Sequence, residues 1–231
     1  MRVPFRPIAR RLTQTLHPQP IMDLSAVQPF FNCLETGAVE RGVLLTVNHY
    51  HAPDFRPWWY VLPISALFPV EIHWLVTAAW RDPRWITGFT GWLFPRLANL
   101  FDFTAMPAMP PEPAETEQRV TAVREVLHFV RTSAHPAIGI SPEGRDQPGG
   151  VLGDLPSGVG RFMLLISQSC PNILPVGVWK EEGIIYFNFG KPYRLEITPG
   201  ITVEEKDRQA GDAVMRKIAE LLPVRLRGMY K

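Results

Sequence analysis

The stretch GVLLTVNHYHAPD, residues 42–54, joins a strand pattern to a cluster of side chains that can carry chemistry. Its apolar start is typical of a buried β-strand that ends at Asn48. His49, His51 and Asp54 follow within a few positions. Two imidazoles and a carboxylate this close together can bind a metal, transfer protons or cap a helix. Which of these three interpretations applies depends on the fold around the stretch.

Outside this stretch, short apolar runs alternate with segments of helical periodicity. Strands are expected over residues 42–47, 71–78, 99–105, 136–141, 172–179 and 183–190. Helices are expected after Asp54, over residues 84–98, 114–133 and 156–168, and around Val214–Leu221. Strands that alternate with helices predict an α/β fold, here a single domain with a largely parallel central sheet flanked by helices.

The composition is that of an ordinary globular protein. The chain has 231 residues, of which 46% are hydrophobic, and its net charge of +2 gives no reason to expect a nucleic-acid partner. Cys33 and Cys170 are too few for a disulfide framework and lie on apolar segments, so we expect buried thiols in a reducing compartment.

The N-terminal segment is basic and carries no pattern of a secretory signal peptide. Ile8, Leu12 and Leu16 fall on one helical face, beside four arginines. The pattern predicts either a short helix on an anionic membrane surface or a solvated, frayed terminus. We therefore separate residues 1–37, a basic segment with possible membrane contact, from the α/β domain of residues 38–231.

One long uncharged run, residues 162–179, could suggest a membrane span. Pro171 and Asn172 interrupt it, and a spanning helix does not normally carry such a break. A helix, a turn and a buried strand explain the run better. The prediction is a cytoplasmic protein that is peripheral on the inner face of the membrane.

His49 and Asp54 have the spacing H-x-x-x-x-D. A carboxylate that accepts a hydrogen bond from Nδ1–H fixes the tautomer and leaves Nε2 as a general base. Such a pair without a serine or cysteine nucleophile suits removal of a proton from a hydroxyl of the substrate. The structural alternative is a histidine at a strand end and an aspartate that caps a helix.

A second polar motif, Pro142 to Arg145, follows the predicted strand 136–141. Since chemistry in parallel sheets gathers beyond the carboxyl ends of the strands, Glu143 and His49 are expected in one crevice. A glycine between an acid and an arginine permits close approach of a phosphate-bearing substrate. The alternative is a turn with a local salt bridge.

Together, NHYHAPD, SPEGRD and LPSGVGRFMLLISQSCPNILPVGV resemble the motifs of the glycerophosphate and lysophospholipid acyltransferase family. Asn48, His49 and Asp54 match its N-H-x4-D motif, and Pro142–Gly144 match its Pro-Glu-Gly motif. The order and spacing agree over residues 42–190. The resemblance implies an acyltransferase-like fold.

The resemblance also implies a mechanism. His49, oriented by Asp54, would deprotonate an acceptor hydroxyl, which attacks the thioester of acyl-CoA or acyl carrier protein. No metal, cofactor or covalent enzyme intermediate is implied. The donor thioester, a lipid acceptor and a membrane surface would be the partners. The implied substrate-binding residues are Asn48, Glu143, Gly144, Arg145, Ser157, Gly158 and Pro175.

Two departures from the family pattern concern the acceptor. The family's second motif places an arginine after a short strand, where this chain offers Thr104. That arginine is associated with the acceptor phosphate, so its replacement argues against glycerol phosphate and lysophosphatidic acid. Arg145 also follows Gly144 directly.

Two other functions stay open at this point. His49, His51 and Asp54 could serve a metal-dependent hydrolase, although the remaining histidines are poor further ligands. The chain could also be a catalytically silent lipid-binding relative. In the acyltransferase interpretation, His51 is a bystander or lines the pocket.

Overall fold

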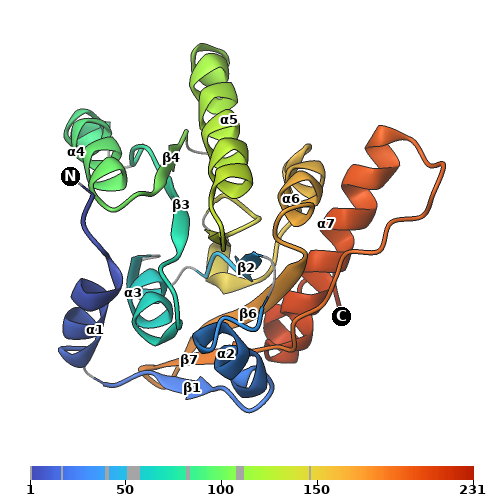
Figure 1. The fold of residues 1–231 in the computed structure, drawn as a ribbon. Helices are drawn as coiled ribbons and strands as arrows, with labels where there is room; N and C mark the ends of the chain where they lie inside the picture. The colour runs from blue at the N-terminus through green and yellow to red at the C-terminus, as the bar shows by residue number, and fades with distance from the viewer. Residues whose placement is uncertain are drawn as a thin grey trace.

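The computed structural model describes residues 2–16, 18–39, 42–50, 58–81, 84–107, 112–145 and 147–231. Within these residues, seven strands form one sheet in the order β1-β7-β6-β2-β5-β3-β4 (Figure 1). The strands are β1 Ile21–Asp23, β2 Val43–Val47, β3 His73–Thr77, β4 Thr104–Met106, β5 Ala137–Ile140, β6 Asn172–Glu181 and β7 Ile184–Phe189.

The sheet is largely parallel. The pairs β2/β5, β2/β6, β3/β5, β3/β4 and β1/β7 are parallel, and β6/β7 is an antiparallel hairpin. β2 through β6 therefore run in one direction, and β1 and β7 run in the other. The predicted α/β fold with a largely parallel sheet is confirmed.

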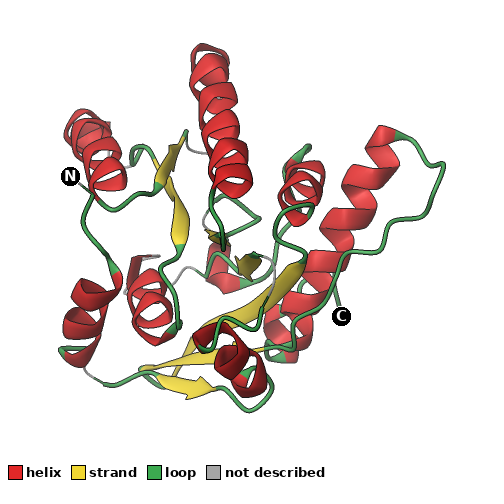
Figure 2. Ribbon diagram, in the orientation of Figure 1, coloured by secondary structure: helices red, strands yellow, loops and turns green. Residues whose placement is uncertain are grey.

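Helices surround the sheet, as Figure 2 shows. They are α1 Arg6–Gln14, α2 Gln28–Glu35, α3 Trp58–Leu67, α4 Thr87–Leu100, α5 Thr116–Thr132, α6 Val159–Ser167 and α7 Val203–Glu220. Short 3₁₀ helices are η1 Arg84–Ile86, η2 Pro113–Glu115, η3 Pro148–Gly150 and η4 Val224–Leu226.

The core lies around the central strands. Every residue of β2 and β5 is buried, as their continuous apolar runs predict for strands covered on both faces. Helices α6 and α7 cross closely, and Gly160 permits this, because a Cβ there would lie 1.9 Å from the Asp207 carbonyl oxygen. This crossing fixes the helix that connects β5 to β6.

Two local expectations were wrong. The strand expected over residues 99–105 is the end of α4 followed by β4, and Asp102 takes a left-handed turn (φ 59°) between them. Cys33 is exposed, because α2 turns Phe31 toward the core instead. The helix expected around Val214 is confirmed as α7, and it begins at Val203, where Thr202 and Glu205 form a capping box that the apolar pattern does not reveal.

The N-terminal segment forms a helix that packs on the domain. α1 lies against α3, and the Arg10 Nε donates to the Ala66 carbonyl at 3.0 Å. The amides of Phe5 and Arg6 donate to the Glu71 carboxylate at the start of α1. β1 and α2 also join the sheet and core, and the boundary drawn after residue 37 stays a prediction.

Among the helices that the structure describes, none combines the length and the apolar character that crossing a membrane requires.

Candidate functional site

The carboxyl ends of β2 and β5, which are neighbours in the sheet, bring His49 and Glu143 together. Glu143 is 1% exposed, and its Oε2 accepts a hydrogen bond from the His49 backbone N–H at 2.7 Å. Its Oε1 accepts one from the Gly153 N–H at 2.9 Å. The buried carboxylate therefore connects the end of β2 to the loop that follows η3.

Burial raises the pKa of the Glu143 carboxyl, and the two backbone hydrogen bonds and the charge of Arg145 oppose that rise. A buried carboxylate needs such partners, because it has lost its hydration. Since both of its oxygens are taken by amides, Glu143 fixes the backbone of His49 in the structure. The His49 side chain itself is half-buried at this edge.

Asn48 fixes the other side of the same strand end. It is 1% exposed, and its Nδ2 donates to the Val178 carbonyl oxygen at 2.9 Å. The Val178 N–H donates to its Oδ1 at 2.7 Å. The Asn48 amide thus satisfies both backbone groups of Val178 on β6, beyond the last paired residue of β2. These contacts give Asn48 a structural role at the site.

The loop after β5 folds against the end of β2. Tyr50 forms a parallel bridge with Gln147, and its ring lies on Gly150. A Cβ at Gly150 would lie 2.3 Å from this ring, and the residue has a φ of 71°, so glycine is required on both grounds. The contact sets the approach of the loop that supplies the Gly153 amide.

Tyr60 and Ser141 belong to the site, and the sequence reasoning missed them. The Tyr60 ring stands edge-on to the His49 ring, with centroids 6.4 Å apart and an interplanar angle of 80°. Its hydroxyl and the Ser141 Oγ are hydrogen-bonded at 2.7 Å. Tyr60 is 5% exposed on α3, and in the sequence it looks like any core aromatic.

Gly144 and Arg145 form the turn beyond Glu143. The Gly144 N–H donates to the Ser141 carbonyl at 3.1 Å, and its φ is 63°. Both residues are exposed. Of the residues predicted to bind substrate, these two lie on the surface beside the His49–Glu143 contact.

Ser157 and Gly158 lie at the start of α6, where Asp207 of α7 already takes the helix amides. The N–H groups of Gly158 and Arg161 each donate to the Asp207 carboxylate at 2.7 Å. Ser157 is exposed. Negative charge at a helix N-terminus is stabilising, so Asp207 fills the role that an anion from a substrate could take there.

Pro175 is buried inside β6, in register with Thr46 of β2. Its carbonyl accepts the Gly190 N–H at 2.9 Å. The structure thus places it within the sheet, earlier along the strand direction than His49.

Thr104 occupies a buried polar pair. Its Oγ1 and the His73 Nε2 are hydrogen-bonded at 2.9 Å, and the His73 ring stacks on Phe129 with centroids 4.1 Å apart. Burial lowers the pKa of His73 to about 4, against the charge of Asp102, which raises it. The side chain at the position of the expected arginine therefore faces the core.

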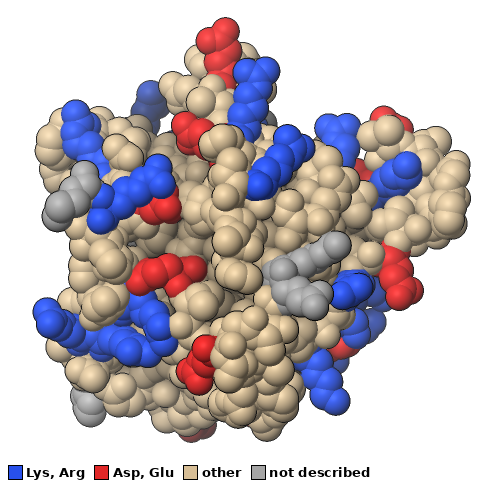
Figure 3. All heavy atoms as spheres, viewed as in Figure 1, with Lys and Arg blue, Asp and Glu red and all other residues tan. Residues whose placement is uncertain are grey.

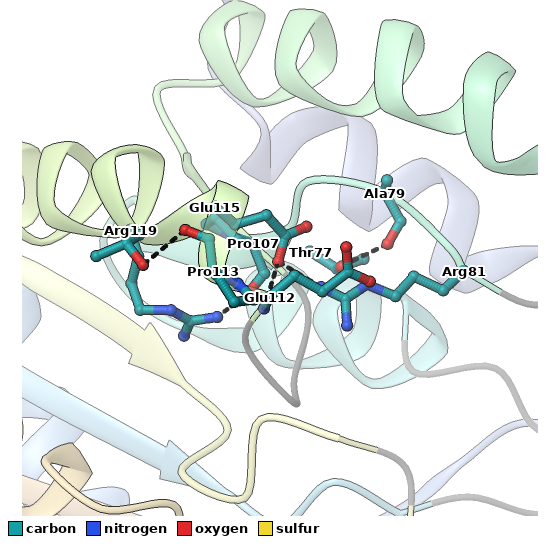
Figure 4. Close-up of polar contacts among 9 residues, drawn as sticks. Thr77, Ala79, Arg81, Pro107, Glu112, Pro113, Glu115 and Arg119 are labelled. Atoms are coloured by element: carbon teal, nitrogen blue, oxygen red, sulfur yellow. Dashed lines mark hydrogen bonds and ion pairs between the residues drawn. The ribbon is translucent and has the colours of Figure 1, made fainter.

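Arginines do gather at the ends of β3 and β4, as Figure 4 shows. Arg81 forms ion pairs with Glu115 and, at 3.7 Å, with Glu112, and Arg119 donates to the Pro107 carbonyl at 3.1 Å. Burial acts to raise the pKa of Glu115, and the hydrogen bond and charge of Arg81 outweigh it and lower that pKa. Among the residues drawn in Figure 4, two arginines are balanced by two glutamates, so this cluster is not a basic patch. Its contacts connect η2 and α5 to the end of the sheet.

His51 and Asp54 lie outside the described residues, so the predicted His49–Asp54 pair is not placed. In the part of the chain that is described, His, Cys, Asp and Glu side chains nowhere gather in threes that could hold a metal ion. The hydrolase alternative, which needs His51 and Asp54, is left to metal analysis of the protein.

Comparison with known proteins finds a likeness in fold. The sequence matches no protein-family model and no curated protein. The structure is similar to the crystal structure of the 1-acyl-sn-glycerophosphate (LPA) acyltransferase PlsC from Thermotoga maritima, with a TM-score of 0.54 and 15% identity. The match covers 94% of this chain and 78% of that chain. The predicted acyltransferase-like fold is confirmed.

Proposed function

We propose that the protein transfers a fatty acyl group from an acyl thioester to a hydroxyl of a glycerophospholipid-type or related lipid acceptor. The observation that carries the proposal is the position of His49. Its half-buried imidazole follows β2 at the carboxyl edge of an acyltransferase-like sheet, and Glu143 holds its backbone. Reactive groups in parallel sheets lie at this edge.

In the proposed reaction, an imidazole nitrogen of His49 takes the proton of the acceptor hydroxyl as its oxygen attacks the thioester carbonyl. The tetrahedral intermediate then expels the thiolate of CoA or of acyl carrier protein. The thiolate leaves as a free thiol after taking up the proton held by His49. The products are an ester and a thiol, and no cofactor takes part. Asp54 is proposed to orient the imidazole.

The remaining predicted residues divide by their contacts. Asn48 and Glu143 hold backbone and are proposed to position His49. Gly144 and Arg145 are exposed beside it, which suits contact with a polar acceptor. Binding roles for Ser157, Gly158 and Pro175 stay predictions.

The acceptor is proposed to be a lipid without a strict requirement for a terminal phosphate. The side chain of Thr104, which stands where the family has an arginine, is bonded to His73 and 3% exposed. A lipid acceptor implies that the protein works at a membrane, and we propose that it is a cytoplasmic protein, peripheral on the inner face of the membrane.

The test is release of free thiol from acyl-CoA in the presence of a panel of lipid hydroxyl acceptors. His49→Ala is expected to lower turnover at least ~100-fold, which is the lower range for loss of a general base. His128→Ala is the matched control, since His128 is an exposed histidine on α5. Full activity of His49→Ala with an unchanged circular-dichroism spectrum would exclude His49 as the base.

Zinc analysis of the purified protein distinguishes acyl transfer from metal-dependent hydrolysis. Stoichiometric zinc together with activity that a chelator abolishes would overturn the acyltransferase proposal in favour of a metal-dependent hydrolase.

A further inference from the structure

Helix α4 and the 3₁₀ turn before it present large aromatic side chains to solvent. Trp85 is 83% exposed, Phe89 61% and Trp92 53%. We call these three residues and Arg96 the aromatic face. Single exposed apolar residues are common on proteins, but several contiguous ones mark an interaction surface.

Three of the four side chains lie on one side of α4, because at about 100° per residue positions 89, 92 and 96 fall within about 60° of one another. Trp85 precedes them in the 3₁₀ turn η1. The Phe89 and Trp92 rings stack with centroids 6.3 Å apart, and the Arg96 guanidinium lies 4.5 Å from the centre of the Trp92 ring. Phe89, Trp92 and Arg96 therefore form a continuous surface along α4 that ends in the Arg96 guanidinium.

The opposite side of α4 already makes the contacts that hold the helix. Thr90 and Ala98 are buried, and the Phe94 ring packs edge-on against Trp80 with centroids 5.1 Å apart. The Thr90 Oγ1 accepts the Trp80 N–H at 3.0 Å. The aromatic face is thus not needed to hold α4 on the domain.

The charged side chains of α4 and of the 3₁₀ turn before it have one sign. Residues 84–101 contain Arg84 and Arg96 and no aspartate, glutamate or lysine. Figure 3 shows Lys and Arg side chains, with some acidic side chains among them, on the side of the molecule where Figure 1 places α4 and α1. Arg2, which pairs with Asp102 just beyond α4, is 68% exposed. A partner of this face should have a negatively charged surface and an apolar interior close beneath that surface.

An anionic lipid bilayer has both properties. Tryptophan prefers the membrane–water interface, and arginine is attracted to anionic headgroups. We propose that the aromatic face is a membrane-docking surface, with Trp85, Phe89 and Trp92 entering the interface of an anionic bilayer and Arg84 and Arg96 at the headgroups. The inference deepens the proposed function by assigning its membrane contact, but the binding test needs no catalysis.

The inference differs from one of the two sequence-based interpretations of the N-terminal segment, in which its helix lies on the membrane. The side chains of Arg6 and Arg10 on α1 donate to the carbonyls of Pro69 and Ala66 at the surface of the domain. Those two cations are engaged with the domain, whereas Trp85 and Trp92 project from it.

Vesicle sedimentation tests the proposal. The wild-type protein is expected to bind vesicles of phosphatidylcholine mixed with phosphatidylglycerol, and to bind phosphatidylcholine alone less. Combined Trp85→Ser, Phe89→Ser and Trp92→Ser should lower the partition coefficient about tenfold or more, because binding scales with buried apolar area. A matched control changes Val203, Val224 and Met229, which are 47%, 62% and 68% exposed elsewhere, to serine.

A conservative pair keeps the test decisive if the triple variant folds poorly. Trp85→Phe with Trp92→Phe should still bind, but should lose most of the fluorescence quenching that brominated lipids cause in the wild type. The proposal is overturned if the wild type does not bind, if the control variant loses as much binding as the aromatic one, or if quenching persists in the phenylalanine pair.

Two further measurements separate the causes of failure. If sedimentation velocity shows a dimer that the serine variant breaks while vesicle binding is unchanged, the face contacts a second copy and the membrane proposal is wrong. Thiol release with acceptor dispersed in detergent should be unchanged in the serine variant. If the wild type releases no thiol in this assay, that result counts against the acyltransferase proposal, whether or not the protein binds vesicles.

Discussion

Replacement of Asn48 by leucine tests whether the site depends on a buried amide at the end of β2. The asparagine side chain is 1% exposed and forms two hydrogen bonds, of 2.9 and 2.7 Å, with the backbone of Val178. Leucine has a similar size and can make neither. The Val178 N–H and C=O would then stay buried without these partners.

The expected cost follows from those two groups. An unsatisfied buried donor or acceptor costs about 1–3 kcal/mol, so the pair costs about 2–6 kcal/mol. Burial of the leucine side chain recovers about 1.5–3 kcal/mol of this. A net loss of about 2 kcal/mol is a sizeable part of the 5–15 kcal/mol that stabilises a typical domain. Because His49 is the next residue, activity should fall together with stability.

Urea denaturation followed by circular dichroism measures the loss, with thiol release measured on the same samples. Asn188→Leu is the matched control, since Asn188 is half-buried and makes one side-chain bond, to the Leu221 carbonyl at 3.1 Å. That variant should lose about 1 kcal/mol. If Asn48→Leu keeps its unfolding free energy within about 0.5 kcal/mol and only raises the KM, Asn48 binds substrate and the structural argument is refuted.

Three further outcomes are expected. Burial lowers the pKa of His73 from 6.5 to about 4, so its neutral form stabilises the fold fully above pH 6.5 and this stability is lost as the pH falls to 4. The loss is about 3 kcal/mol. Between pH 7 and 4, the unfolding free energy of the wild type should therefore fall by about 3 kcal/mol more than that of His73→Gln. An equal fall in both proteins would contradict the lowered pKa of His73. Asp207→Ala should lower thermal stability by about 1–3 kcal/mol, because the amide of Gly158 and a second amide of α6 lose their acceptor, and an unchanged melting temperature would show that water replaces it. Tyr60→Phe removes the hydroxyl bonded to Ser141 but keeps the ring beside the imidazole, so we expect kcat to fall more than KM rises; a change in neither excludes a positioning role.

Hydrophobic patterning was sufficient to predict the strands that position the site. The runs at 42–47 and 136–141 are buried on both faces in the structure, and an uninterrupted apolar run has that meaning in a parallel sheet. The same reasoning failed over residues 99–105. The aromatic-rich sequence there is compatible with the end of a helix and with a strand. The left-handed turn at Asp102, which separates the two in the structure, is only weakly indicated by the sequence.

The contacts of the site were beyond the reach of sequence patterns for a different reason. The partner of Asn48 lies 130 residues away in sequence, and it is set by the register of β2 against β6. The position of the Tyr60 ring, edge-on to the His49 imidazole, likewise depends on how α3 packs against the sheet. Residue types and spacing indicate which groups can do chemistry, but register and packing decide which of them meet.

Two buried polar side chains hold the backbone around His49 from opposite sides. Asn48 bonds to β6, and Glu143 brings the His49 amide to the loop after β5. Each has its polar atoms taken by backbone, so neither can turn toward a substrate without leaving a buried amide unsatisfied, at about 1–3 kcal/mol. A substrate-binding group would instead gain a partner when the ligand arrives. The motif residues flanking the imidazole are therefore better explained as its support, and in the proposed function the acceptor would be recognised by exposed groups such as Arg145.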